Sequence, residues 1–383
     1  MALEDPFEGS LSLVSQSESN ALAAIPTCRG VLLFTDTQNQ PVRFTYCANL
    51  RRTVQAKLFS DSEEPSRRAD IAHVTEQIYY LPCRTEYESF RQYIHLAHRL
   101  FPASFDDYIS LPSPRCVCAD PMQLWGAFNC SDQPLQNKSA AWFGLFPSRK
   151  AADAFAQAWN TVFGLCRNRR LALAGKGKQC SYYQMGLCPG PCLDHANEAM
   201  YRRTVEQAVE AASRTVNQTI NLIRIQMKQK AANMEFEQAQ LLKKQMEELE
   251  QLEGSAYQWT SNLQDLNIIH IDKSCFSRKQ GRKKIPAFCI YEINTRQTIL
   301  LKEIFISKET EEPNEETMPI EALELPVLKI SEHLGLLSYY LYRSSPPGIW
   351  MSKSRFLCMD EKDLERLITK IFLEKKSNDK AAE

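Results

Sequence analysis

Four cysteines in the middle of the chain are the residues whose type and spacing most clearly suggest chemistry. They are Cys166, Cys180, Cys188 and Cys192, all within 27 residues. Four thiolates are the number that a tetrahedral zinc ion or a 4Fe–4S cluster requires. The first interval carries only positive charge, in Arg167, Arg169, Arg170, Lys176 and Lys178. A basic loop held by a metal predicts phosphate binding, so nucleic acid is the first expected ligand.

The spacing of these cysteines leaves the kind of site open. It is not the paired CxxC of a zinc ribbon, although Pro189, Gly190 and Pro191 favour a tight turn that lets two of the sulfurs converge. The alternative is a set of free buried thiols, because cysteine is enriched in this chain, with 13 in 383 residues. Disulfides are not expected, since the cysteine count is odd and the N-terminus resembles no secretion signal.

The composition is that of an ordinary globular protein of two or three domains. Basic and acidic residues balance, 46 against 46, so an anion-binding surface must come from local segregation of charge. Such segregation exists, because 166–178 is basic and 307–316 is acidic. No stretch approaches the length of about 20 apolar residues that spans a membrane. We therefore expect a cytoplasmic protein without membrane contact.

The predicted fold class is α+β, beginning with a small domain in the order ββαβα. Residues 1–25 are rich in Ser, Glu and Ala and predict a disordered tail, and residues 26–105 predict the domain. Its expected strands are Gly30–Thr37, Val42–Tyr46 and Ile71–Leu81, and its expected helices are Ala48–Phe59 and Glu86–Phe101.

The remaining chain predicts a helical region between two mixed segments. Residues 106–197 predict a linker with short strands, a helix at Ser148–Phe163 and the cysteine-cluster region. Residues 198–254 predict helices, residues 260–375 a β-rich α/β segment, and residues 376–383 a tail. Within the last segment we expect strands at Asn267–Asp272, Ala287–Ile293, Thr298–Ser307 and Gly348–Met351, and helices at Leu328–Tyr342 and Glu361–Leu373.

A narrow apolar seam runs along the second half of the helical region. Its residues recur at spacings of three or four and are flanked by charges, a pattern that favours pairing with another helix. Pairing within the chain and pairing with a partner protein are both open. The seam consists of Phe236, Ala239, Leu242, Met246, Leu249 and Leu252.

Taken together, residues 25 to about 355 resemble the N-terminal part of the UvrC family, the dual-incision subunit of bacterial nucleotide excision repair. The string CSYYQMGLCPGPC at 180–192, with Cys166, is similar to the family's cysteine box, which holds an iron–sulfur cluster. The resemblance implies a 4Fe–4S cluster on the four cysteines, whereas the spacing alone also allows zinc. Residues 231–252 resemble the UVR motif (231–252), a helical hairpin that docks on UvrB in this family. It implies a UvrB-like partner that binds Phe236, Ala239, Leu242, Met246 and Leu249.

The N-terminal domain resembles a GIY-YIG nuclease domain in its hydrophobic frame but not in its chemistry. In that family a tyrosine activates water, a glutamate holds a divalent metal, and an arginine and a lysine steady the phosphate charge. Aligned on Asn49-Leu50, the first motif's tyrosine becomes Leu32, the second motif's tyrosine Arg43 and the following lysine Tyr46. The helix arginine becomes Thr53, and the metal glutamate becomes Tyr93. Every position that carries the chemistry has changed, so we expect an inactive nuclease site.

The sequence therefore predicts a non-catalytic UvrC-like protein that binds DNA and a repair partner. Arg51 and Arg52, on the helix of the nuclease-like domain, would extend the basic surface of the cysteine loop. Besides a UvrB-like protein, a full-length UvrC is a possible partner. Two alternatives stay open: an active UvrC-like or Cho-like endonuclease that makes a single incision, and a redox-responsive DNA-binding regulator.

Overall fold

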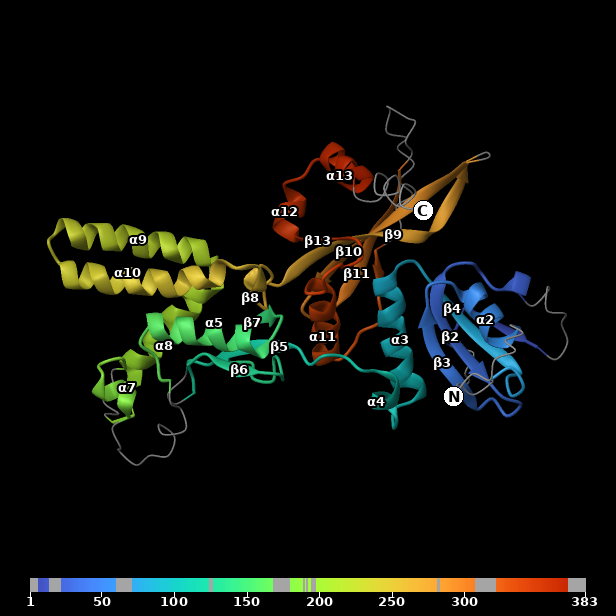
Figure 1. Cartoon of the computed structure of the whole chain (residues 1–383), viewed down its shortest axis with the longest axis horizontal. Coiled ribbons are helices and arrows are strands. Elements are labelled where there is room, and N and C mark those ends of the chain that lie inside the picture. The colour runs from blue at the N-terminus through green and yellow to red at the C-terminus, as the bar shows by residue number, and fades with distance from the viewer. Residues whose placement is uncertain are drawn as a thin grey trace. The chain divides into compact units, whose positions relative to one another are not determined.

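The computed structural model describes residues 6–13, 22–59, 71–123, 127–167, 180–188, 190, 192–193, 198–280, 283–306 and 322–370. The chain divides into two compact units that alternate along the sequence. Unit 1 comprises residues 1–110, 267–328 and 345–383, and unit 2 comprises residues 111–266 and 329–344. The segment 260–375, expected as one α/β segment, is thus divided between the two units. Helices and antiparallel sheets occur in both, which confirms the α+β class (Figure 1).

The first sheet of unit 1 has the strand order β1-β4-β2-β3, with all neighbours antiparallel. Helix α2 covers one face and α3 the other (Figure 1). Alternation along β2 explains these two layers, because Leu32 and Phe34 are buried in one hydrophobic cluster with Leu50 and Val54 of α2. The elements are β1 Gly9–Ser12, β2 Arg29–Thr35, β3 Pro41–Cys47, β4 Gln77–Cys83, α2 Leu50–Leu58, α3 Glu86–Leu100 and α4 Phe105–Tyr108.

Two expectations for this domain are wrong. The tail expected to be disordered contains β1, which pairs with β4 and buries Leu11, since its alternation of small polar and apolar residues lets it complete the sheet. The third strand begins at Gln77 rather than at Ile71, because the backbone N–H of Thr75 donates to the Ile71 carbonyl and closes a turn there.

The second sheet of unit 1 has the order β12-β11-β10-β9-β13. Its central hairpin, β9 and β10, is longer than the sequence predicted and carries a register shift between Pro286 and Phe288. Isoleucines at 269, 271 and 290 are buried in its core. The elements are β9 Asn267–Gln280, β10 Lys283–Asn294, β11 Thr298–Phe305, β12 Leu323–Glu324, β13 Ile349–Ser352, α12 Lys353–Leu357 and α13 Glu361–Ile368.

Unit 2 packs a four-stranded sheet, in the order β6-β5-β7-β8, against an alanine-rich helix, α5. Trp159 of α5 is fully buried, and Asn160 beside it exchanges two hydrogen bonds of 2.9 Å with the backbone of Phe128. The short strands expected between 103 and 140 are confirmed as β5 and β6. The elements are β5 Arg115–Ala119, β6 Asn129–Ser131, β7 Ala141–Phe146, β8 Ser261–Asn262, α5 Arg149–Val162, α7 Ser181–Gln184 and α11 Ile330–Leu341.

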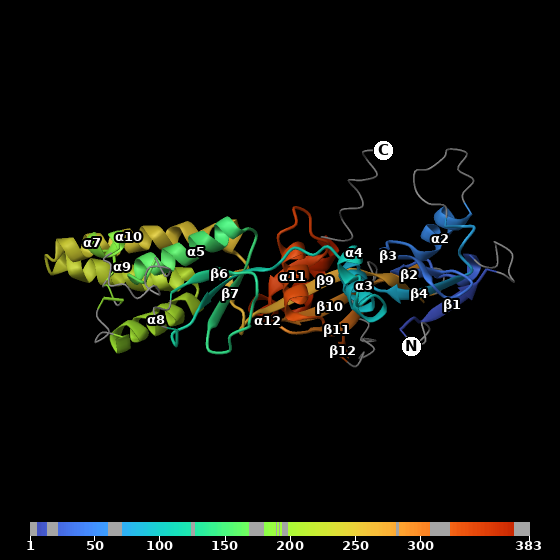
Figure 2. The same ribbon diagram turned by 90° about the horizontal axis from the view of Figure 1, so that it is seen from below.

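Three helices complete unit 2 where the sequence predicted one helical region. They are α8 Glu198–Ser213, α9 Val216–Ala232 and α10 Phe236–Glu250, followed by 3-10 turns at Gln251–Glu253 and Ser255–Tyr257. Helices α9 and α10 form an antiparallel hairpin, and α10 also contacts α5 (Figure 2). Residues 231–252 therefore supply the turn and the second helix of this hairpin, and α9 supplies the first. None of the helices in the described part of the chain is long and apolar enough to cross a membrane.

Candidate functional site

The four cysteines lie beside the end of α5 and the start of α8. Cys166 is buried three residues after α5, and its backbone N–H donates to the Tyr201 hydroxyl of α8 at 2.9 Å. Cys192 packs against the same hydrophobic cluster. Gly190 takes a left-handed conformation, with φ of 70°, directly against the Tyr183 ring, where a Cβ would lie 2.4 Å from a ring carbon. Glycine is thus required at the turn that brings the last cysteine back.

Electrostatic coupling groups these thiols around Tyr201. Burial raises the pKa of the Cys188 thiol, and the neighbouring Cys180 and Cys192 raise it further while Arg167 opposes them. Burial also raises the pKa of Tyr201, and Cys166, Cys188 and Cys192 add to that shift. The side chains that the sequence picks out are thus close enough to affect one another's ionisation.

The same thiols do not converge into a formed metal site. Across the residues that the structure describes, no three His, Cys, Asp or Glu side chains are arranged to hold a metal ion. The donor type suits zinc or an iron–sulfur cluster, since thiolates are the ligands both prefer, but the positions of the sulfurs do not fit either group. A cluster on these cysteines therefore stays a prediction.

Of the basic residues predicted to hold DNA, the structure describes three. The Arg167 guanidinium lies over the Tyr182 ring, 5.3 Å from its centroid. Arg51 donates hydrogen bonds to the carbonyl oxygens of Ile25 at 2.8 Å and Ala23 at 3.1 Å, so its guanidinium holds the segment before β2. Arg52 is exposed. Arg169, Arg170, Lys176 and Lys178 lie outside the described residues.

The positions aligned with nuclease residues fall on both faces of the first sheet. Leu32 is fully buried in the α2-side cluster. It pairs with Thr45, and Arg43 pairs with Phe34 on the same face. Thr53, on α2, forms a hydrogen bond with the Cys47 thiol.

Tyr46 and Tyr93 lie on the opposite face, in an aromatic cluster with α3. Tyr93 stacks on Phe44 with ring centroids 4.5 Å apart, and Tyr46 stacks on Phe90 at 4.9 Å. Burial raises the pKa of Tyr93 to about 12, and its hydroxyl donates to the Tyr108 carbonyl oxygen at 3.4 Å. A ring packed in this way supplies no carboxylate for a divalent metal.

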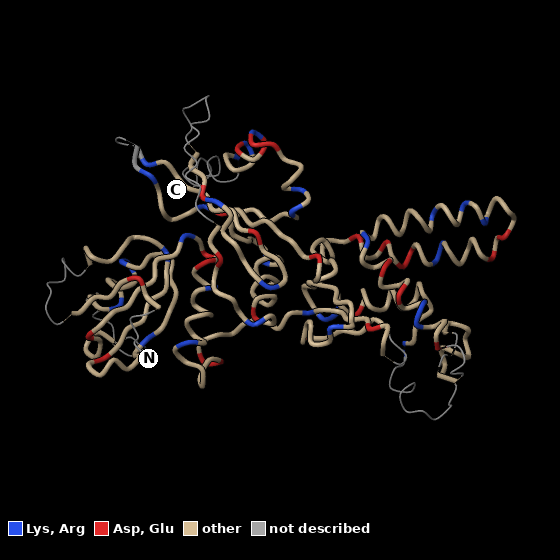
Figure 3. Tube along the Cα trace, turned by 180° about the vertical axis from the view of Figure 1, so that it is seen from behind, with Lys and Arg blue, Asp and Glu red and all other residues tan. Residues whose placement is uncertain are grey.

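The apolar seam of α10 changes from exposed to buried along the helix. Phe236, at the hairpin turn, is 66% exposed, Leu242 and Met246 are partly buried against the core, and Leu249 is fully buried. Leu249 is therefore a core residue in this arrangement and cannot face a partner, a correction to its predicted role. Most of the seam pairs within the chain, with Phe236 as its exposed end. Charges of both signs follow the hairpin outside the seam (Figure 3).

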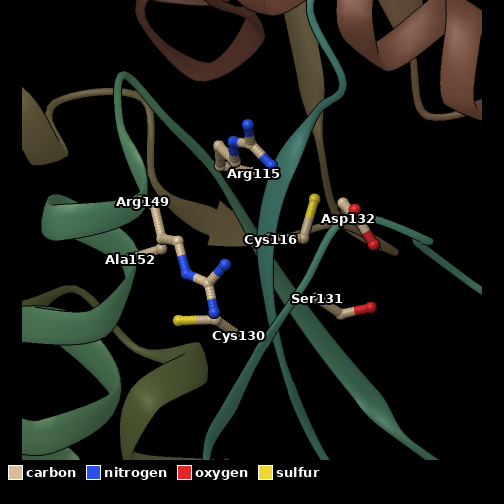
Figure 4. A pocket seen from close by; sticks show the side chains of 7 residues that line it. All are labelled: Arg115, Cys116, Cys130, Ser131, Asp132, Arg149 and Ala152. Carbon is tan, nitrogen blue, oxygen red and sulfur yellow. The ribbon is translucent and has the colours of Figure 1, made fainter.

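A pocket of about 100 Å³ in unit 2 was not predicted from the sequence. Its two cations are Arg115, at the start of β5, and Arg149, the first residue of α5 (Figure 4). Within the described residues the Arg115 side chain has no hydrogen-bond or ion-pair partner, and Arg149 has only a long contact of 3.8 Å to Asp153. The lining residues are Arg115, Cys116, Cys130, Ser131, Asp132, Arg149 and Ala152. Only the folded sheet brings the two arginines together, so no local motif could have revealed them.

Comparison with known proteins gives the class of this molecule. Residues 128–211 match the family described as the UvrC/Cho excinuclease, middle domain. That range holds α5, α7 and all four cysteines of the candidate site. The chain is thus a UvrC-like protein with a middle domain of the UvrC/Cho type.

Individual relatives carry the same name. The chain is 30% identical to UvrABC system protein C of Deinococcus radiodurans over 131 residues, 34% of this chain and 21% of the relative. It is 26% identical to that of Oleidesulfovibrio alaskensis over 237 residues, 60% of this chain and 33% of the relative. With that of Neisseria meningitidis it shares 23% identity over 256 residues, 65% of this chain and 40% of the relative. These matches span only about a fifth to two-fifths of the relatives' length. No solved structure matches the chain.

Proposed function

We propose that this protein is a non-catalytic, UvrC-like DNA-binding protein of nucleotide excision repair. Similarity to UvrABC system protein C supports the repair role. The observation that carries the non-catalytic part is the aromatic packing of Tyr93, at the position aligned with the metal-binding glutamate. Without a carboxylate there, the N-terminal domain lacks the charge that would hold a divalent metal against a phosphodiester.

Binding of DNA is proposed to use phosphate contacts on unit 2. The basic interval 167–178 would supply part of this surface, next to the four cysteines. Arg115 and Arg149 would supply a second part, because two weakly paired guanidinium groups beside a helix N-terminus attract an anion. Figure 4 shows the Asp132 carboxylate pointing away from Arg149, so it does not neutralise that guanidinium directly. Contacts of this kind bind DNA of any sequence and weaken as salt rises.

Removal of either pocket arginine is expected to weaken DNA binding. Arg115→Ala and Arg149→Ala should each lower affinity for duplex DNA by about three- to tenfold at low salt. Each should also reduce the slope of log K against log salt by about 1, because one phosphate contact is lost. Fluorescence anisotropy titrations over a range of salt concentrations measure both quantities.

A matched control is Arg366→Ala, since the side chains of Arg149 and Arg366 are both 78% exposed. Its affinity and salt slope should equal those of the wild type. If both pocket variants also equal the wild type, the pocket holds no DNA phosphate. If the wild type itself binds no DNA at low salt, the proposed function is wrong.

The cofactor is proposed to be a 4Fe–4S cluster on Cys166, Cys180, Cys188 and Cys192, with zinc as the alternative. The grouping of four thiols around Tyr201 supports a shared ligand. Its structural role would be to hold the basic interval in one conformation. We expect anaerobically purified protein to show a visible absorption band with matching iron and sulfide, and Cys188→Ser to lose it. A colourless wild-type protein that contains stoichiometric zinc would instead establish the alternative.

A UvrB-like partner is proposed to dock at the exposed end of the α9–α10 hairpin. The Lys230 ammonium donates to the Glu235 carboxylate at 2.8 Å, lowers the pKa of Glu235 and closes the turn beside Phe236. We expect Phe236→Ala to reduce capture of a UvrB-like protein at least tenfold while the melting temperature stays unchanged, because this ring packs on little of its own chain. Leu357→Ala is the control, since Leu357 is equally exposed at 69%. Equal capture by the two variants would exclude this docking site.

A further inference from the structure

Four further cysteines, distant from one another in the sequence, gather near the start of β2 in unit 1. Cys28 directly precedes β2, whose first two residues pair with Cys83 of β4 and Cys47 of β3. Cys275 reaches the same place from β9 and packs against the hydrophobic cluster that contains Cys28. All four are free thiols in the structure. Because no described group of three is arranged to hold a metal ion, the chemistry to consider here is that of thiol pairs.

Backbone hydrogen bonds fix the position of Cys275 at this junction. Its backbone N–H donates to the Arg84 carbonyl oxygen at 2.8 Å, and its Sγ donates to the Cys83 carbonyl oxygen at 2.9 Å. Arg29, which follows Cys28, is the register partner of Cys83. These contacts bring the thiols of Cys28 and Cys275 into a hydrogen bond with each other.

The two thiols of this pair differ in acidity. The hydrogen bond with Cys28 lowers the pKa of Cys275, assisted by the Arg29 backbone and charge. The same bond, together with burial, raises the pKa of Cys28. Cys275 is also the more accessible of the two, since Cys28 is only 4% exposed. A pair of this kind combines a nucleophilic thiolate with an adjacent thiol that can resolve its oxidised form.

The two neighbouring cysteines are less suited to react. Burial raises the pKa of Cys83 well above its ordinary value, and its thiol donates to the Leu81 carbonyl oxygen at 3.6 Å. Burial likewise raises the pKa of Cys47. Both thiols therefore favour the protonated form, which is a poor nucleophile.

We propose that Cys28 and Cys275 form an oxidisable pair, which closes to a disulfide when the protein meets a peroxide. The Cys275 thiolate attacks one peroxide oxygen, the O–O bond breaks, and a sulfenic acid and a hydroxide result. The Cys28 thiol then attacks the sulfenic sulfur, the S–S bond forms, and the hydroxyl leaves as water with the Cys28 proton. In balance, two thiols and one hydrogen peroxide give one disulfide and two waters.

This disulfide would tie the first strand of one sheet of unit 1 to the second sheet through β9. Because the closed loop is long, the bond restricts the unfolded chain strongly, and we expect the melting temperature of the oxidised protein to rise by about 5 °C or more. The effect is independent of DNA binding and of any cluster on the other four cysteines.

The test is a disulfide map of the whole chain, oxidised by hydrogen peroxide under native conditions, with non-reducing peptide mass spectrometry. The expected result is a peptide pair linked through Cys28 and Cys275 that disappears on reduction with dithiothreitol. Cys275→Ser should lose the link and the rise in melting temperature. Cys358→Ser removes an exposed thiol on the same unit and should keep both.

Two results would overturn the inference. One is that both cysteines remain free thiols after Cys358 has been fully oxidised. The other is that Cys28 or Cys275 links instead to Cys47 or Cys83. Because the map is read on the wild-type chain, it decides the matter even where a serine variant does not fold.

Discussion

Replacement of Glu88 by alanine is expected to lower the free energy of unfolding by about 3–5 kcal/mol. Glu88 is 3% exposed, at the first turn of α3. Its carboxylate accepts hydrogen bonds from the backbone N–H and the guanidinium of Arg84, each at 3.0 Å, and from the Tyr291 hydroxyl of β10 at 3.0 Å. The loss is large because alanine leaves a partly buried guanidinium and a fully buried hydroxyl without an acceptor.

The matched control for this variant is Glu86→Ala, on the same turn of the same helix. Its ion pair with Arg29 is 3.6 Å long and partly exposed, so its removal should cost no more than about 1 kcal/mol. Urea unfolding, compared through midpoints at constant slope, measures both. Equal losses for the two variants would contradict the structural role of the Glu88 network.

Replacement of Asp272 by asparagine is expected to stabilise the protein at pH 8, by up to about 4 kcal/mol. Burial raises the pKa of Asp272 from 3.8 to about 7, against the opposing effects of the Lys273 backbone N–H and of Arg29. The folded state thus binds a proton that the unfolded state releases. Stability from this group is full below about pH 4 and is lost as the pH rises through about 7.

His270, two residues away on β9, has the opposite pH dependence. Burial lowers the pKa of His270 from 6.5 to about 3, and its ring stacks on Trp350 with centroids 3.8 Å apart. Its stabilising contribution is full above about pH 6.5 and is lost as the pH falls through about 3. Between pH 4 and 6.5 the two residues oppose each other, so the wild type should show a shallow pH dependence.

The asparagine variant separates these two contributions. With Asp272→Asn, stability should be higher at pH 8 and should fall on acidification below pH 6.5, because only His270 still titrates differently in the two states. Denaturant unfolding at a series of pH values measures this. Asp265→Asn, at an exposed position, should follow the wild type. An Asp272→Asn curve parallel to that of the wild type would show that Asp272 does not carry a raised pKa.

Local patterns predicted most elements of the fold because each pattern is short. The helix at α3 has Thr85 as a side-chain N-cap, and its buried residues recur at helical spacing. Alternation and turn residues likewise predicted β2, β3 and the β10–β11 pair. β1 escaped prediction because its four residues gain stability only from β4, which lies far along the chain. The interleaving of the two units is equally invisible to a local pattern.

The candidate site divides in the same way. The grouping of Cys166 with Cys180, Cys188 and Cys192 follows from short spacing and a proline–glycine turn, and the structure brings these thiols near Tyr201. The Arg115–Arg149 pocket and the Cys28–Cys275 pair depend on strand register and on contacts between distant segments. The burial of Leu249 depends on the packing of α10 against unit 2. A helical seam alone does not distinguish a core from a docking face.

The central claim, that this protein holds DNA without cutting it, is tested most directly with an end-labelled duplex and the wild-type protein in the presence of Mg²⁺ or Mn²⁺. One half of each reaction is run on a native gel and the other half on a denaturing gel. The account predicts a salt-sensitive shift of the duplex on the native gel and intact strands on the denaturing gel. Strand incision that depends on the metal ion and is lost in the Tyr93→Phe or Tyr46→Phe variant would contradict it.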